Sequence, residues 1–303
     1  MAGFFNTLPS VLDQGIIWGI MAIGVFITFK ILDFADLTVD GSFATGGCLF
    51  AILTAAGVPV PLGFLISFFA GAAAGLITAL LHCYLGIPGI LAGILTQLML
   101  WSINYKILGQ ASMPINSRDA LISMNASSGV YTTIPIVIGI AAILILVLYW
   151  FFGTKYGSSI RATGSNEAMA KANGININAR KIIALMISNG IVAFAGALLA
   201  RFQGSADINM GRGAIVIGLA AIVIGTTLFS RLSKNFALNM AFVTVGAIIY
   251  FFVFQFIVYV TNEPELLKML SAIVVAIFLA VPYIKNVYIK NAHSKHQRAK
   301  EAK

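Results

Sequence analysis

The chain has 303 residues, of which 59% are hydrophobic and 10% are charged, and its formal net charge is +9. Soluble domains carry about 25% charged residues, so this composition excludes a soluble domain and predicts a single all-α polytopic membrane domain over residues 1–303. The positive charge does not indicate a nucleic-acid partner, because the basic residues fall in loops and in a tail at 285–303, where membrane orientation accounts for them.

Apolar runs divide the chain into about nine expected membrane-spanning segments, within a range of eight to ten, because a bilayer core needs about 20 apolar residues per helix. Proline and glycine mark the breaks, as at Pro59 with Pro61 and at Pro88. The first run lacks the cleavage site of a secretory signal, so we expect it to be retained. The expected segments lie near 11–32, 42–57, 62–84, 89–108, 134–153, 182–202, 214–229, 236–260 and 267–284.

Pairs of glycines spaced four residues apart occur inside three of these segments. Two small residues on one helix face let a neighbouring backbone approach closely. With 29 glycines in the chain, some such pairs also arise by chance. The pairs are Gly15 with Gly19, Gly71 with Gly75, and Gly89 with Gly93.

Two similar polar stretches precede the two shortest segments. FADLTVDGSF spans 34–43 and SADINMGRGA spans 205–214, and Asp36 aligns with Asp207. The spans that follow would run in opposite directions, which predicts an inverted repeat of about 11–108 and 182–284 around a connector at 134–153. Interrupted helices at matching positions of such repeats form the central pathway of many transporters.

The carboxylates of these stretches are expected either to shape a translocation pathway or to cap the broken helices. Polar residues of the fourth segment could join them. The alternative for each is hydrogen bonding within or between helices. The candidate pathway residues are Asp36, Thr38, Asp40, Gln97, Asn104, Asp207 and Asn209.

Residues 154–181 form a polar island between apolar runs. We expect a short helix there, with Ser165 as the N-cap, Glu167 in the first turn and Gly174 at the end. Lys171 follows Glu167 at i+4, where the two can pair. A small apolar surface that could dock in a groove of another protein is expected from Ala168, Met169, Ala170 and Ala172.

The distribution of basic residues predicts which loops lie on the cytoplasmic side of the membrane. The island carries five and the tail six; a turn holds Arg231 and Lys234, and Lys30 would lie on the same side. The excess of lysine and arginine on the cytoplasmic side of membrane proteins predicts a cytoplasmic C-terminus and an outside N-terminus. Five basic residues would remain outside or at the outer edge, namely Lys106, Arg118, Arg201, Arg212 and Lys268.

Three stretches carry a resemblance to a known family. YGSSIRATGSNEAMAKANGI at 156–175 resembles the cytoplasmic loop of permeases of the branched-chain amino acid/ribose class of ABC importers, although Met169 interrupts the family's alanine pair. DLTVDGS at 36–42 is similar to an element of the sugar members, and its Asp40 resembles a subgroup with amino-acid-like substrates. GLAAIVIG at 218–225 resembles a further family element.

The resemblance implies a type II ABC-importer-like permease fold in a bacterial inner membrane. It implies that the island is a coupling helix seated on a cytoplasmic ATPase. It also implies that an extracytoplasmic binding protein delivers a small solute, and we expect an amino acid, in particular an aromatic one, over a sugar. The chain would pair with a second copy and contact lipid. ATP and magnesium would bind to the ATPase, and this chain would hold no cofactor or metal. The implied coupling residues are Gly157, Arg161, Gly164, Asn166, Glu167, Ala168 and Gly174.

The residues alone leave two other functions open. Buried aspartates at broken helices also fit an ion-coupled secondary transporter, although that leaves the polar island unexplained. A membrane enzyme would need a convergent set of catalytic groups, and none can be placed in the sequence. The chain also has no G-x4-G-K-[ST] phosphate-binding loop, so any ATP hydrolysis would take place in a separate subunit.

Overall fold

A computed structural model describes residues 2–115, 130–229 and 235–261, and residues 269, 272, 273, 276 and 280. Seven helices in these ranges are long and apolar enough to cross a membrane, and α9 is a shorter apolar helix. The expected ninth segment, the turn with Arg231 and Lys234, and the tail lie wholly or mostly outside the described residues. The elements are α1 Ala2–Phe26, the π-helical turn η1 Ile27–Ile31, α2 Thr38–Ala55, α3 Val60–Cys83, α4 Gly89–Leu108, β1 Ser112–Pro114, α5 Val130–Gly153, α6 Lys155–Ser165, α7 Glu167–Ala172, α8 Ile177–Gln203, β2 Ser205–Asp207, α9 Ala214–Leu228 and α10 Phe236–Thr261.

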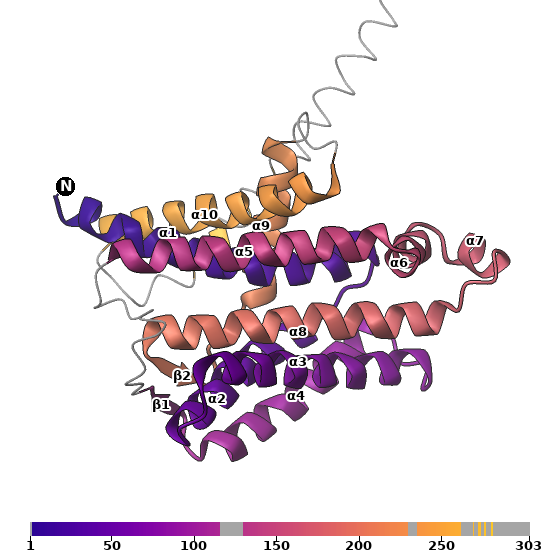
Figure 1. The fold of residues 1–303 in the computed structure, drawn as a ribbon, viewed down its shortest axis with the longest axis horizontal. Helices are drawn as coiled ribbons and strands as arrows, with labels where there is room; N and C mark the ends of the chain where they lie inside the picture. Colours follow the sequence, from indigo (N-terminus) through magenta and orange to yellow (C-terminus); the bar gives the residue numbers. More distant parts are fainter. Residues whose placement is uncertain are drawn as a thin grey trace, which may run out of the picture.

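The helices pack in two groups, which Figure 1 shows one above the other. Helices α1, α5, α9 and α10 form one group and α2, α3, α4 and α8 form the other, with α1 and α8 in contact between them. The third helix of each expected repeat packs along the first helix of the other, because α3 contacts α8 and α10 contacts α1. Within each repeat, the second and third helices are also in contact, α2 with α3 and α9 with α10. The corresponding helices of the two expected repeats therefore make matching contacts, and the inversion of one repeat relative to the other stays a prediction.

Both expected breaks are present, but the first is displaced. The chain leaves η1 at Ile31, runs without helix through residues 32–37, and begins α2 at Thr38. Asp40 and Gly41, expected inside the break, therefore lie in the first turn of α2, which is longer than the expected 42–57. The second break holds β2 and a turn, and α9 begins at Ala214 as expected.

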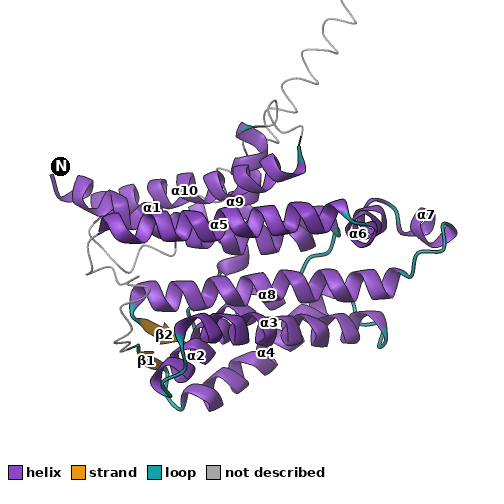
Figure 2. Ribbon diagram, viewed as in Figure 1, coloured by secondary structure: helices purple, strands orange, loops and turns teal. Residues whose placement is uncertain are grey.

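The two ends of the molecule differ in character. Strands β1 and β2 pair antiparallel, Ser112 opposite Asp207, at the end where α1 begins (Figure 2). Each strand has three residues, too few for an alternating pattern in the sequence, and the pairing was not predicted. Helices α6 and α7 lie at the opposite end of the molecule (Figure 1).

The predicted glycine contacts are present. A Cβ at Gly71 or Gly75 would meet the backbone of α8, one at Gly15 or Gly19 would meet α10, and one at Gly89 or Gly93 would meet Phe34 or Leu37. Helices α2 and α8 approach most closely where a Cβ on Gly196 would overlap the carbonyl oxygen of Phe43 and one on Gly46 that of Ala193. These contacts hold the broken helix α2 against the continuous helix α8.

We expect Gly196→Ala to lower the melting temperature of the detergent-solubilised protein by several degrees, because overpacking costs about 1–3 kcal/mol. The matched control is Gly139→Ala in α5, where the added Cβ would meet no atom within 4 Å. The control should leave the melting temperature unchanged or slightly raise it. Equal melting temperatures for the two variants would contradict the close α2–α8 contact.

Candidate functional site

The polar island folds as two short helices instead of the single one expected. Helix α6 begins after Thr154, whose hydroxyl accepts the Gly157 N–H at 3.3 Å, and it ends at Ser165. Asn166 has an extended backbone and caps α7 through its side-chain oxygen, which accepts the Met169 N–H at 3.0 Å. The expected N-cap, Ser165, is therefore wrong by one residue. Gly174 follows α7 with φ of 75°, as a C-terminal glycine should.

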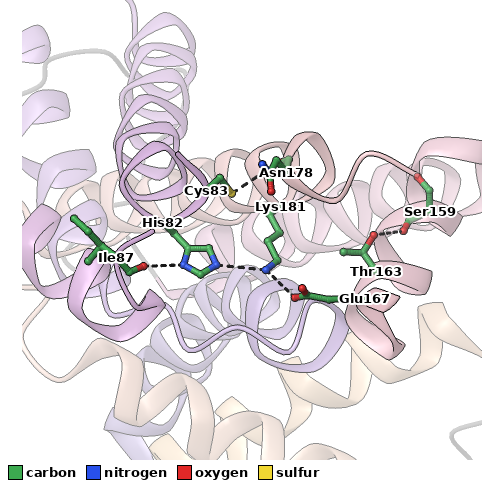
Figure 3. Close-up of polar contacts among 8 residues, drawn as sticks. All are labelled: His82, Cys83, Ile87, Ser159, Thr163, Glu167, Asn178 and Lys181. Carbon is green, nitrogen blue, oxygen red and sulfur yellow. Dashed lines mark hydrogen bonds and ion pairs between the residues drawn. The ribbon is translucent and has the colours of Figure 1, made fainter. Parts of the chain in front are cut away.

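Helix α7 is tied to the membrane helices by a row of polar contacts (Figure 3). Glu167 pairs with Lys181 of α8 at 2.7 Å, not with Lys171 as expected. The Lys181 ammonium also lies 3.4 Å from Nε2 of His82, near the end of α3. His82 Nδ1 lies 2.9 Å from the carbonyl oxygen of Ile87. Lys181 was missed because its partner His82 is 99 residues away in the chain.

Two glycines of the island allow α6 to pack closely against neighbouring backbone. A Cβ on Gly164 would overlap the carbonyl oxygen of Ile31, and one on Gly157 would overlap the end of α5. Arg161 lies over the ring of Phe236, at the start of α10, with 5.8 Å to the centroid. These three residues seat α6 on the membrane helices.

The outward face of α7 differs from the one expected. Met169 is 66% exposed, and Ala168 and Ala172 are exposed beside it. Ala170 is buried and faces the protein, so it does not belong to the apolar surface. The surface that remains for a partner consists of Ala168, Met169 and Ala172, with charged Glu167 and Lys171 next to it.

The first break is held by a buried polar network. Asp36 accepts the Thr38 N–H at 2.9 Å and an amide N–H of Asn189 on α8 at 2.6 Å. The Thr38 hydroxyl lies 2.6 Å from that of Thr78 on α3, which donates to Thr96 on α4 at 2.9 Å. Asp36 and Thr38 are almost wholly buried and cap and cross-link the break.

The second break contains the same aspartate turn as the first, and a side chain that follows the first break caps the helix after it. Asp207 accepts the Asn209 N–H at 2.6 Å, the same i to i+2 bond that Asp36 makes to Thr38. Asp40 accepts the N–H groups of Gly213 at 3.0 Å and Ile215 at 2.9 Å, 173 and 175 residues away. The carboxylate of α2 therefore caps the start of α9.

A cavity of about 160 Å³ opens beside this cap. It brings together three of the predicted pathway residues, Asp40, Gln97 and Asn104, and excludes Asp36 and Thr38. Asn209 lies nearby, where its side-chain oxygen accepts the Trp101 indole N–H at 3.4 Å. The remaining lining residues are Gly41, Ala44, Leu98, Trp101, Ile208 and Arg212.

Sequence reasoning missed Trp101 and Arg212. Trp101 lies four residues after Gln97 and three before Asn104, so helical spacing puts all three on one face of α4. Arg212 stands in the second broken stretch, but as a basic residue it was used only for orientation. Within the described ranges, no group of three His, Cys, Asp or Glu side chains could hold a metal ion.

We expect Asp40→Ala to destabilise the start of α9, because two backbone N–H groups lose their side-chain acceptor. Losing a cap of this kind costs about 0.5–2 kcal/mol. Hydrogen–deuterium exchange should become faster at the amides of 213–216, while Asp40→Asn, which keeps one acceptor oxygen, should show a smaller effect. Unchanged exchange in Asp40→Ala would contradict the capping role.

Comparison with known proteins places this chain in a wider group. A family model described as "Branched-chain amino acid transport system / permease component" matches residues 7–280. The chain is 39% identical over 273 residues to a tyrosine transport system permease protein of Clostridioides difficile (strain R20291), covering 89% of this chain and 90% of that protein.

The chain is also similar, more distantly, to a sugar import permease and to a solved ABC transporter chain. The chain is 30% identical over 184 residues to the galactose/methyl galactoside import permease protein MglC of Escherichia coli K12, covering 57% of this chain and 53% of that protein. Its fold matches a solved chain, described as a metal-chelate type ABC transporter in an inward-facing conformation, with a TM-score of 0.51 and 14% identity. That match covers 92% of this chain and 85% of the other.

Proposed function

The chain belongs to the family of branched-chain amino acid transport system permease components, and on that premise we propose how it couples ATP hydrolysis to solute movement. It is the multi-pass inner-membrane permease of an ABC importer, a family that works with ATPase and binding-protein partners. Because the chain belongs to this family, we no longer consider an ion-coupled secondary transporter.

Helix α7 is the coupling helix in this proposal, seated in a groove of a cytoplasmic ATPase subunit. The observation that carries the proposal is the exposed Met169 on a helix whose other side is fixed to α8 by the Glu167–Lys181 pair. A helix that must transmit force needs both an accessible face and a rigid attachment. Asn166 and Gly174 set its two ends, and Ala168 joins its contact face. Gly157, Arg161 and Gly164 hold the neighbouring helix α6 on the membrane helices.

The remaining parts of the transporter follow from this arrangement. Because one chain contains both halves of the repeat, about 11–108 and 182–284, we propose that two copies form the membrane unit. ATP and magnesium bind to the ATPase subunits, and this chain holds no cofactor. The coupling loop, Lys30 and the tail are cytoplasmic, and the N-terminus is outside. Support for this orientation is that α1 begins at the end opposite α6 and α7 (Figure 1).

The solute is proposed to be an amino acid, and an aromatic one in particular. The relative named for tyrosine transport matches along nearly the whole chain at 39% identity, whereas MglC, named for galactose import, matches 57% of it at 30%. Asp40, Gln97 and Asn104 line the pathway at the cavity, and Asn209 lies at its rim. Asp36, Thr38 and Asp207 shape the pathway indirectly by holding the two breaks.

The coupling proposal predicts that Ala168→Arg and Met169→Arg each abolish co-purification of an ATPase from native membranes in mild detergent. An arginine fits poorly in an apolar groove, yet its helix propensity leaves α7 intact. The matched control is Gln110→Arg, an exposed position just after the last turn of α4. The control should retain a partner that mass spectrometry identifies by its phosphate-binding loop.

Two results would contradict the proposal, and they differ in meaning. Retention of the ATPase by both α7 variants would remove α7 as the docking surface. Absence of any ATPase from the wild-type preparation would count against the proposed assembly itself.

A further inference from the structure

The cavity beside Asp40 has the polar groups of a ligand site. Its wall carries one acid, one base, two amides and one indole, in Asp40, Arg212, Gln97, Asn104 and Trp101. Gln97 is the ninth of the 20 residues of α4, so the cavity lies within the membrane-spanning part of the molecule. Charged side chains at such depth face a water-filled cavity or a partner, because hydrocarbon is too costly for them.

Arg212 lacks a partner in the part of the chain that the structure describes. Its side chain is exposed and makes no hydrogen bond or ion pair with a described residue, although it lines the same cavity as Asp40. An arginine guanidinium offers planar pairs of N–H donors that match a carboxylate. Because Arg212 lines the cavity and makes no bond to a described side chain, its donors are available to a ligand carboxylate.

Asn104 gives independent evidence for a ligand. Its side chain is 1% exposed, and neither its amide nitrogen nor its amide oxygen has a hydrogen-bond partner among the described residues. A buried polar group left unpaired costs about 1–3 kcal/mol, so such groups in folded proteins need an explanation. The amide can accept from an ammonium group and donate to a carboxylate, which fits a ligand that carries both.

Asp40 can hold the positive end of that ligand. Each of its two carboxylate oxygens accepts one N–H of α9, at 3.0 Å and 2.9 Å. An ionised carboxylate has about four lone-pair sites, so each oxygen keeps one for another donor. The two backbone bonds therefore hold the carboxylate in place and leave it able to accept further hydrogen bonds.

The dimensions and the aromatic wall suit an amino acid. A cavity of about 150 Å³ is enough for a benzene ring, and this one is about 160 Å³. Trp101 is 44% exposed and stacks on Tyr105 with 6.1 Å between the ring centroids. An aromatic side chain leaving the cavity would meet the exposed indole.

We propose that this cavity is a transient binding site for a zwitterionic α-amino acid within the translocation pathway. Arg212 binds the carboxylate, Asp40 and Asn104 bind the ammonium group, and Trp101 contacts the side chain. The site makes this permease itself selective for amino acids over sugars. The inference rests on the proposed function, since it requires that a solute passes beside α4.

The test measures binding of radiolabelled L-tyrosine and L-alanine to the purified permease–ATPase complex in nanodiscs, without a binding protein. L-Tyrosine should bind at least tenfold more tightly than tyramine, which lacks the carboxylate, or 3-(4-hydroxyphenyl)propionate, which lacks the ammonium group. D-Galactose should not compete. Arg212→Gln and Asn104→Leu should each weaken L-tyrosine binding about tenfold or more, and Arg212→Lys should weaken it less than Arg212→Gln.

Trp101→Leu provides a variant at an exposed position that should fold normally. It should reduce the preference for L-tyrosine over L-alanine, because only the aromatic side chain of tyrosine reaches the indole. The site is overturned if neither amino acid binds the wild-type complex, or if Arg212→Gln and Asn104→Leu leave the affinity unchanged. Co-purification of the ATPase with every variant separates failure of this site from failure of the coupling proposal.

Discussion

The structure depends on a carboxylate from one half of the chain capping a helix in the other. Asp40, in the first turn of α2, accepts the N–H groups of Gly213 and Ile215 at the start of α9. Backbone groups freed by a break within the membrane must be satisfied by protein or water, because hydrocarbon offers no hydrogen bonds. Asp40 meets this need for α9, and it joins the two broken stretches at one point.

A continuous set of contacts connects this point to the proposed coupling helix. Glu167 of α7 pairs with Lys181, which lies against His82, and the ring of His82 packs edge-on against Phe34 at 5.0 Å. Phe34 belongs to the linker 32–37, whose Asp36 caps α2. In the proposed assembly, these contacts would link a movement of α7 on an ATPase to the start of α2 and to the cavity beside it.

The sequence predicted the helices and both breaks because these follow from local signals. Apolar length, proline and glycine locate the spans, and the two Ala-Asp motifs locate the breaks. The start of α2 at Thr38 follows a local signal that the prediction did not use, because Asp36 accepts the Thr38 N–H two residues later. The bond from the Asn189 amide of α8 to Asp36 could not be read from local sequence. Likewise, the contact of Lys181 with His82 and the meeting of Arg212 with Asn104 in one cavity join distant parts of the chain.

If solute passes beside α4 as proposed, the cavity beside Asp40 belongs to a water-filled pathway and does not face lipid. The most direct test is labelling of Gln97→Cys by a charged, membrane-impermeant thiol reagent, in a protein whose Cys48 and Cys83 are replaced. Ile143→Cys, at a 63% exposed position on α5, is the lipid-facing reference. A water-filled pathway predicts that Gln97→Cys reacts much faster than Ile143→Cys and that its rate changes when the partner ATPase binds ATP. Equally slow labelling at both positions would contradict it.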